Sequence, residues 1–143
     1  NIINSMSNVK MFNNQLLSLI TELINYFDDS KMKILKEKIS IVTSVNSTLI
    51  ITLFLNNIYK FKDNIMKKEE SFFLKHITPD NVSDLYSKNK ELATENNINI
   101  IDVINLKDYW TSLHNDDKET IWKYFQVLIV LSEKWALQNI KTI

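Results

Sequence analysis

The sequence of 143 residues contains no glycine, no cysteine and no arginine, so its 17 basic residues are all lysines. Without glycine the chain has neither a phosphate-binding P-loop nor the glycine-rich turn of dinucleotide-binding proteins. Without cysteine it has no disulfide, no thiol nucleophile and no cysteine-ligated zinc or iron–sulfur cluster. Without arginine it lacks the bidentate clamp for phosphate, carboxylate or guanine. These absences exclude many classes of enzyme and nucleotide-binding protein.

The residues that are present have the composition of a globular domain. The chain is 45% apolar and 24% charged, and 17 acidic residues balance the lysines. A net charge of zero gives no long-range attraction to DNA or to an anionic membrane. The length is typical of one domain, so we expect residues 1–143 to form a single domain.

The composition is strongly biased. Ile (20), Asn (18) and Lys (17) make up about two-fifths of the chain, whereas Ala occurs twice. The codons of Lys, Asn and Ile are rich in A and T, so the bias indicates an A/T-rich genome rather than a requirement of folding. The first residue is Asn1 rather than Met, as in a fragment or a processed product.

No apolar run approaches the eighteen or so residues that a membrane-spanning helix needs. The longest runs, Leu49–Leu55 and Val127–Leu131, are interrupted or bounded by polar residues. The N-terminal residues lack the pattern of a signal peptide. The sequence therefore predicts a protein that is not secreted, remains inside the cell and has no membrane span.

Hydrophobic periodicity predicts three helices in the first 58 residues. The first runs from about residue 7 to Phe27 and stops at Asp28-Asp29-Ser30, which also offers a new N-cap. The second continues to about Val42, and Ser47 is the predicted cap of the third. The predicted core positions are Phe12, Leu16, Leu19, Ile20, Leu23, Phe27, Met32, Leu35, Ile39, Val42, Leu49, Ile50, Leu53, Phe54 and Ile58.

The middle of the chain is less regular. Residues 59–76 predict one short helix and an irregular piece. Thr78-Pro79 is a typical helix start, because Thr caps and Pro fits the first turn. Residues 87–97 are polar, as in a solvated helix or a loop. Ile98–Leu106 fits either a helix or an edge strand.

The strongest predicted helix is Asp117–Asn139. Asp116 is its predicted N-cap, and Glu119 completes a pair that resembles a capping box. Nearly every side chain in residues 124–131 is apolar, so we expect this helix to be covered on most sides. The sequence predicts an all-α, single-domain bundle of five to seven helices with this helix at its centre.

Candidate catalytic and metal-binding residues are few. His76 and His114 are the only imidazoles, and neither has the spacing of a metal-ligand motif. The acidic pairs at 28–29, 69–70 and 116–117 are adjacent residues, which point away from each other on a helix. No serine lies in a Gly-x-Ser-x-Gly elbow, since the chain has no glycine. We therefore predict a non-enzymatic protein without catalytic residues, metal or cofactor.

Two lysine clusters suggest an alternative function as a nucleic-acid-associated protein. Tyr59 and Phe61 interleave with the second cluster, as in proteins that bind single-stranded nucleic acid. Lysine contacts to phosphate would be independent of base sequence. Nearby acidic residues dilute both clusters. The candidate residues are Lys31, Lys33, Lys36, Lys60, Lys62, Lys67 and Lys68.

Aromatic residues concentrate in the last third of the chain, and most of them are expected in the core. Tyr109 and Trp110 lie just before a predicted turn, so we expect them to be exposed. Aromatic residues often anchor protein interfaces. Tyr109, Trp110 and Trp122 are therefore the predicted partner-binding residues, in an exposed apolar patch beside the last helix.

Two segments carry a resemblance to a known group of proteins. Phe12–Leu16 opens an amphipathic helix, and Asp117–Leu128 forms most of the last one, with Tyr109-Trp110 before the turn. In these segments the chain resembles small helical proteins of large nucleocytoplasmic DNA viruses, many of which have A/T-rich genomes. The resemblance leaves the middle of the chain uncovered and carries over no catalytic residue. It implies a viral protein, in the virion or the infected-cell cytoplasm, that contacts a viral or host protein.

A second alternative rests on outline alone. A small helical bundle with one nearly all-apolar helix resembles the viral Bcl-2-like proteins, whose groove accepts an amphipathic helix. The chain lacks the Asn-Trp-Gly-Arg signature of that family, since it has neither glycine nor arginine. The oligomeric state is left open.

Overall fold

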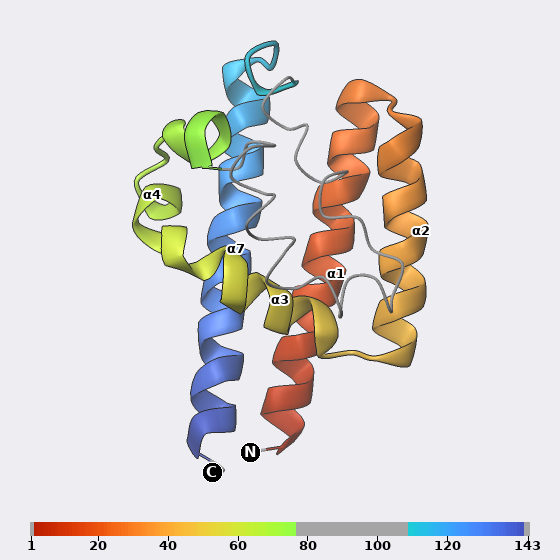
Figure 1. Cartoon of the computed structure of the whole chain (residues 1–143), viewed down its shortest axis with the longest axis vertical. Helices are drawn as coiled ribbons and strands as arrows, with labels where there is room; N and C mark the ends of the chain where they lie inside the picture. Colours follow the sequence, from red (N-terminus) through yellow and green to blue (C-terminus); the bar gives the residue numbers. More distant parts are fainter. Residues whose placement is uncertain (1, 77–108, 142–143) are drawn as a thin grey trace.

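Two long antiparallel helices, α1 and α7, form the body of the molecule (Figure 1). The computed structural model describes residues 2–76 and 109–141. Within these ranges every regular element is a helix, which confirms the predicted all-α fold. The elements are α1 (Ile2–Phe27), α2 (Ser30–Val45), α3 (Leu49–Asn57), the 3-10 helix η1 (Tyr59–Phe61), α4 (Lys62–Met66), the π-helix η2 (Phe72–His76) and α7 (Asn115–Lys141).

The other helices lie around this pair. Helix α2 packs against α1, and α4 packs against the opposite side of α7, so α2 and α4 flank the pair (Figure 1). Helix α3 contacts α1, α2 and α7. Because α7 contacts α1, α3 and α4, its predicted central position is confirmed. The helix start predicted at Thr78-Pro79 and the ambiguous segment Ile98–Leu106 lie outside the described residues.

The buried face of α2 follows the predicted periodicity. All four positions expected in the core of this helix are buried there: Met32, Leu35, Ile39 and Val42. Leu49, Ile50, Leu53 and Phe54 of α3 are buried as well, whereas Ile58 is only partly buried. Apolar spacing of three and four residues was therefore sufficient to identify the inner face of these helices.

Helix α2 begins where a cap was predicted. Asp29 is the N-cap, and its carboxylate accepts a hydrogen bond from the Lys31 backbone N–H at 2.8 Å. The cap predicted for the third helix is wrong by one position. Thr48, not Ser47, is the N-cap of α3, and its side chain makes no capping hydrogen bond. Helix α2 also continues to Val45, three residues beyond its predicted end.

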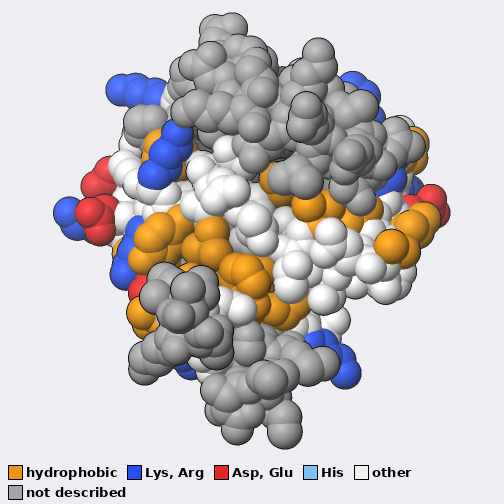
Figure 2. Space-filling model, turned by 60° about the horizontal axis from the view of Figure 1, so that its bottom comes forward, with side chains coloured by type: hydrophobic (Ala, Val, Ile, Leu, Met, Phe, Trp, Pro, Cys, Tyr) orange, Lys and Arg blue, Asp and Glu red, His pale blue; other side chains and the backbone are white. Residues whose placement is uncertain are grey.

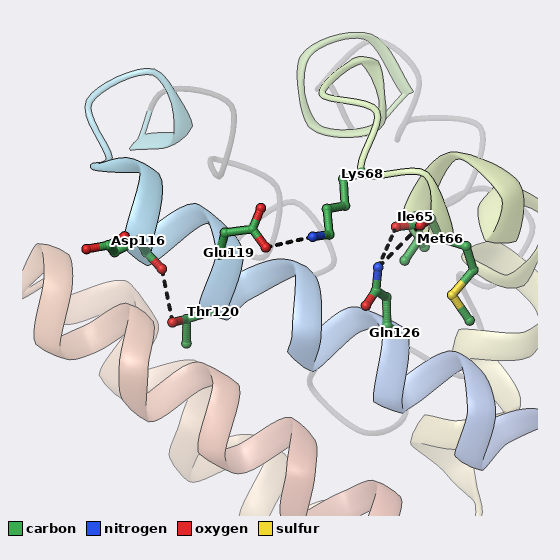
Figure 3. Close-up of polar contacts among 7 residues, drawn as sticks. All are labelled: Ile65, Met66, Lys68, Asp116, Glu119, Thr120 and Gln126. Carbon is green, nitrogen blue, oxygen red and sulfur yellow. Dashed lines mark hydrogen bonds and ion pairs between the residues drawn. The ribbon is translucent and has the colours of Figure 1, made fainter.

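Helix α7 begins at Asn115, before the predicted start. Asp116 therefore lies inside the first turn rather than at the cap, together with Asp117. The Asp116 carbonyl accepts a hydrogen bond from the Thr120 hydroxyl at 3.1 Å (Figure 3). Carboxylates in the first turn are favoured by the partial positive charge at a helix N-terminus.

Two helices end in a left-handed residue without using glycine. Asp28 follows α1 with φ 46°, and Lys68 follows α4 with φ 57°. After α4 the Glu69 N–H donates to the Asn64 carbonyl at 2.8 Å, and the Lys68 N–H donates to the Ile65 carbonyl at 3.1 Å. This pair of hydrogen bonds is a Schellman motif, in which glycine usually occupies the left-handed position.

An aromatic cluster forms the part of the core between η2 and α7. Phe73 stacks on Trp110 with ring centroids 4.2 Å apart, and Trp110 meets Trp122 edge to face at 5.3 Å. Phe72 and Phe125 complete the cluster at 5.5 Å from each other. All five side chains are buried. Aromatic pairs in such edge and stacked arrangements stabilise a fold beyond the area that they bury.

Polar contacts join α4 and the segment after it to α7 (Figure 3). Lys68 Nζ lies 2.7 Å from the Glu119 carboxylate. The Gln126 amide donates to the carbonyls of Ile65 and Met66, at 3.4 Å each, near the C-terminal end of α4. These contacts hold the lysine-rich segment against the central helix.

Candidate interaction surface

The three predicted partner-binding residues do not form an exposed patch. Trp110 is 1% exposed and Trp122 is 3% exposed, so the prediction that they are available to a partner is wrong. The physical reason is the aromatic cluster. Burying two indole rings lowers the free energy by more than a local preference for an exposed turn could offset. Tyr109 is partly buried and stacks on Phe27 at 4.3 Å.

The Tyr109 hydroxyl also has a structural role. It donates a hydrogen bond to the Asp29 carboxylate, which caps α2. This hydrogen bond is the largest cause of the lowered pKa of Asp29, followed by the backbone N–H of Lys31. Tyr109 therefore joins the segment before α7 to the turn between α1 and α2.

Three of the seven candidate nucleic-acid-binding lysines are paired with acids. Lys33 contacts Asp28 at 2.7 Å, Lys62 contacts Glu133 at 2.6 Å, and Lys68 contacts Glu119 at 2.7 Å. The pKa of Lys62 is raised, first by its hydrogen bond to Glu133. Lys60 and Lys67 are exposed on the α4 side of the molecule.

The two lysine clusters do not form one continuous face. Lys31, Lys33 and Lys36 lie on α2, whereas the second cluster lies on and around α4. Helices α2 and α4 are on opposite sides of the α1–α7 pair (Figure 1). A single strand of nucleic acid would therefore have to pass around the bundle to contact both.

The titratable groups of the described residues do not converge on one point. His114 is exposed just before α7, and its carbonyl accepts the Lys118 N–H at 3.0 Å. The side chain of His76 lies outside the described residues. Among residues 2–76 and 109–141, no three His, Asp or Glu side chains lie close enough to hold a metal ion.

The remaining pKa shifts have local causes. Burial raises the pKa of Tyr26, and the nearby Glu22 raises it further. The pKa of Asp28 is lowered by the hydrogen bond from Lys33. Each shift is explained by burial or by one ion pair, so none marks a group prepared for proton transfer.

Sequence reasoning missed an exposed apolar stripe on α2. Ile34, Ile41 and Val45 are 52%, 65% and 83% exposed, and we call these three residues the α2 outer face. Their spacing of seven and four residues places them on one side of the helix. That side lies about 120° around the helix axis from the buried stripe that packs against α1.

A signal for the α2 outer face was present in the sequence. Once Met32, Leu35, Ile39 and Val42 are assigned to the core, helical geometry places Ile34, Ile41 and Val45 away from it. An apolar residue outside the core stripe is informative when several share one face.

A second exposed apolar stripe lies on α7. Val127, Val130 and Leu137 are 40%, 41% and 59% exposed, and the exposed Lys123 and Lys134 lie in the same stripe. Two of these three apolar side chains are less than half exposed, so this stripe offers less apolar surface than the α2 outer face. Figure 2 shows a further band of hydrophobic side chains across the middle of the face turned forward, with charged side chains at its margins. The α2 outer face carries the most exposed of the apolar side chains in the described residues.

Within the described residues, no helix by itself has the length and apolar character to cross a membrane. Helices α2 and α3 meet this criterion only as a pair, and they are bent by 114° relative to each other.

Comparison of the chain with models of protein families, with curated proteins and with solved structures finds no match.

Proposed function

We propose that this chain is a non-enzymatic helical protein that acts by binding another protein through the α2 outer face. The observation that supports the proposal is the concentration of three large aliphatic side chains, each more than half exposed, on one stripe of one helix. Single exposed apolar residues are common on protein surfaces, but several on one contiguous stripe mark interaction sites.

Burial of this face supplies part of the free energy of a specific contact, and other contacts with the partner must supply the rest. Full burial of an aliphatic side chain contributes about 1.5–3 kcal/mol. Ile34, Ile41 and Val45 are already partly covered, so a partner would gain roughly 1 kcal/mol from each. Polar contacts at the rim then determine which partner is chosen.

The proposal includes a viral role. The resemblance of residues 12–16 and 117–128 to small proteins of large nucleocytoplasmic DNA viruses supports two versions, a virion component and a binder of a host protein. Mass spectrometry of purified virions and of infected-cell cytoplasm separates them by the compartment in which the chain accumulates.

The test of the binding function is affinity capture with paired variants. The double variant Ile34→Ser/Ile41→Ser removes the apolar face, whereas Leu137→Ser removes a residue of similar exposure (59%) from α7. We expect the double variant to lose a partner that the wild-type chain and Leu137→Ser both retain. Circular dichroism checks that all three proteins fold.

Two results would contradict the proposal. One is a set of partners that is identical for wild type and the folded double variant, since binding would then not use α2. The other is turnover of a substrate by the purified chain that the double variant leaves unchanged, since the activity would then be enzymatic and independent of this face.

A further inference from the structure

One flank of α2 has the spacing of a helix–helix seam. Lys31, Ile34, Lys38, Ile41 and Val45 follow one another at intervals of three, four, three and four residues. This alternation is the a/d pattern by which one helix packs along another. We call these five residues the α2 seam. In Figure 1 α2 is an outer helix, with α1 against its inner side.

The charge of the α2 seam indicates the chemistry of its partner. Lys31 and Lys38 stand at two of its five positions, and among the described residues neither forms an ion pair. By contrast, Lys33 on the same helix is paired with Asp28. Glu37 is the single acid within α2. A helix facing this seam therefore meets aliphatic side chains and two positive charges.

We propose that the α2 seam binds an amphipathic helix of a partner protein that has an apolar seam and acidic residues facing Lys31 and Lys38. This inference rests on the proposed function and names its partner class. Charge complementarity carries it, because a lysine within an apolar seam favours an acidic residue and opposes a basic one on the facing helix.

The same charges disfavour a second copy of the chain. In an antiparallel pair of α2 helices, lysines of the two seams would face each other. Each helix has one acid, Glu37, to offset these positive charges. Like charges placed across an interface oppose association. The two seams would therefore need anions that neither copy provides.

A membrane surface fits the α2 seam less well than a helix does. Helices that lie in a membrane interface have a broad apolar face, commonly with Trp, Phe or Leu. The α2 seam has three aliphatic residues in a narrow stripe, and no aromatic residue lies within α2. A narrow stripe with alternating spacing is matched by another helix.

The test uses the full chain and two synthetic peptides of three heptads. Both have Leu at the seam positions that face Ile34, Ile41 and Val45. At the positions that face Lys31 and Lys38 the acidic peptide has Glu, and the basic peptide has Lys. Repulsion between the Glu residues limits self-pairing of the acidic probe. Fluorescence anisotropy at low and physiological salt measures binding of each labelled peptide.

We expect the wild-type chain to bind the acidic peptide at least tenfold more tightly than the basic one, with an affinity that falls as salt rises. Ile41→Ser is expected to weaken binding of the acidic peptide at least tenfold, and Leu137→Ser to leave it unchanged. Lys38→Glu is expected to reduce or reverse the preference between the two peptides, which a purely structural role of Lys38 would not do.

Three results would overturn the inference. The first is equal binding of both peptides, or of neither, by the folded wild-type chain. The second is binding to phosphatidylserine vesicles that Ile41→Ser abolishes, without binding to the acidic peptide. The third is self-association that Ile41→Ser abolishes. If a captured partner depends on Ile34 and Ile41 while the acidic peptide fails to bind, the proposed function stands and the inference fails.

Discussion

Replacement of Lys68 by glycine is expected to stabilise the protein, although glycine usually weakens a helical region. Lys68 has φ 57° and occupies the left-handed position of the Schellman motif after α4. An L-residue in this conformation costs about 1–2 kcal/mol, a cost that glycine avoids. Part of this stabilisation is offset, because glycine increases the conformational entropy of the unfolded chain.

Comparing Gly and Ala at position 68 isolates the free-energy cost of the left-handed backbone conformation. Both Lys68→Gly and Lys68→Ala remove the ion pair with Glu119, so their difference reports the backbone alone. We expect Lys68→Gly to be more stable than Lys68→Ala by about 1 kcal/mol, which is roughly 3–4 °C in Tm for a chain of this length.

The adjacent residue provides the control. Lys67 has φ −86° in the right-handed region, so Lys67→Gly should be less stable than Lys67→Ala by about 0.5–1 kcal/mol. Urea unfolding followed by circular dichroism gives all four free energies of unfolding. If Gly is no better than Ala at position 68, the left-handed C-terminus of α4 is refuted.

Three further predictions use other parts of the fold. Ile39→Ala should lower the free energy of unfolding by about 2–4 kcal/mol, whereas Ile41→Ala should change it by less than about 0.5 kcal/mol. Equal losses in urea unfolding of the two variants would contradict the assigned faces of α2. Trp110→Ala should cost about 4 kcal/mol. Trp110→Phe should cost clearly less, because it keeps a ring against the cluster and removes a buried indole N–H that has no hydrogen-bond partner within residues 2–76 and 109–141. Equal thermal shifts for the two variants would refute that packing. The pKa of Asp29 is lowered, mainly by the Tyr109 hydroxyl, so the ionised Asp29 contributes fully to the free energy of unfolding above the ordinary value of 3.8 and loses that contribution as the pH falls below it. The stability difference between wild type and Asp29→Asn should therefore shrink below pH 3.8, and Tyr109→Phe should reduce this pH dependence.

The helices that could be predicted from sequence are those whose apolar residues repeat on one face. Met32, Leu35, Ile39 and Val42 mark the inner side of α2 by spacing alone, and the structure buries all four. The cap at residues 28–30 was equally local, because a short polar side chain at a helix start bonds to a backbone N–H two residues away. Local periodicity and capping were therefore sufficient for these elements.

Burial of Trp110 could not be predicted in this way. The residue lies next to a turn, and its local sequence resembles an exposed segment. Its burial depends on contacts with Phe73, which lies in η2, and with Trp122, which lies in α7. Lys118 also covers the indole ring at 5.3 Å. Such contacts are set by how the helices are arranged, and a periodic pattern within one helix carries no information about them.

Ile39 and Ile41 separate the two uses of α2. They are the same residue type, two positions apart on one helix, and they are 5% and 65% exposed. Removal of the Ile39 side chain leaves a cavity against α1, so any loss of binding in Ile39→Ala is accompanied by a loss of stability. Removal of the exposed Ile41 side chain is expected to leave the fold intact. A loss of binding in Ile41→Ala at unchanged stability would therefore be a property of the outer face itself, because destabilisation of the bundle could not produce it.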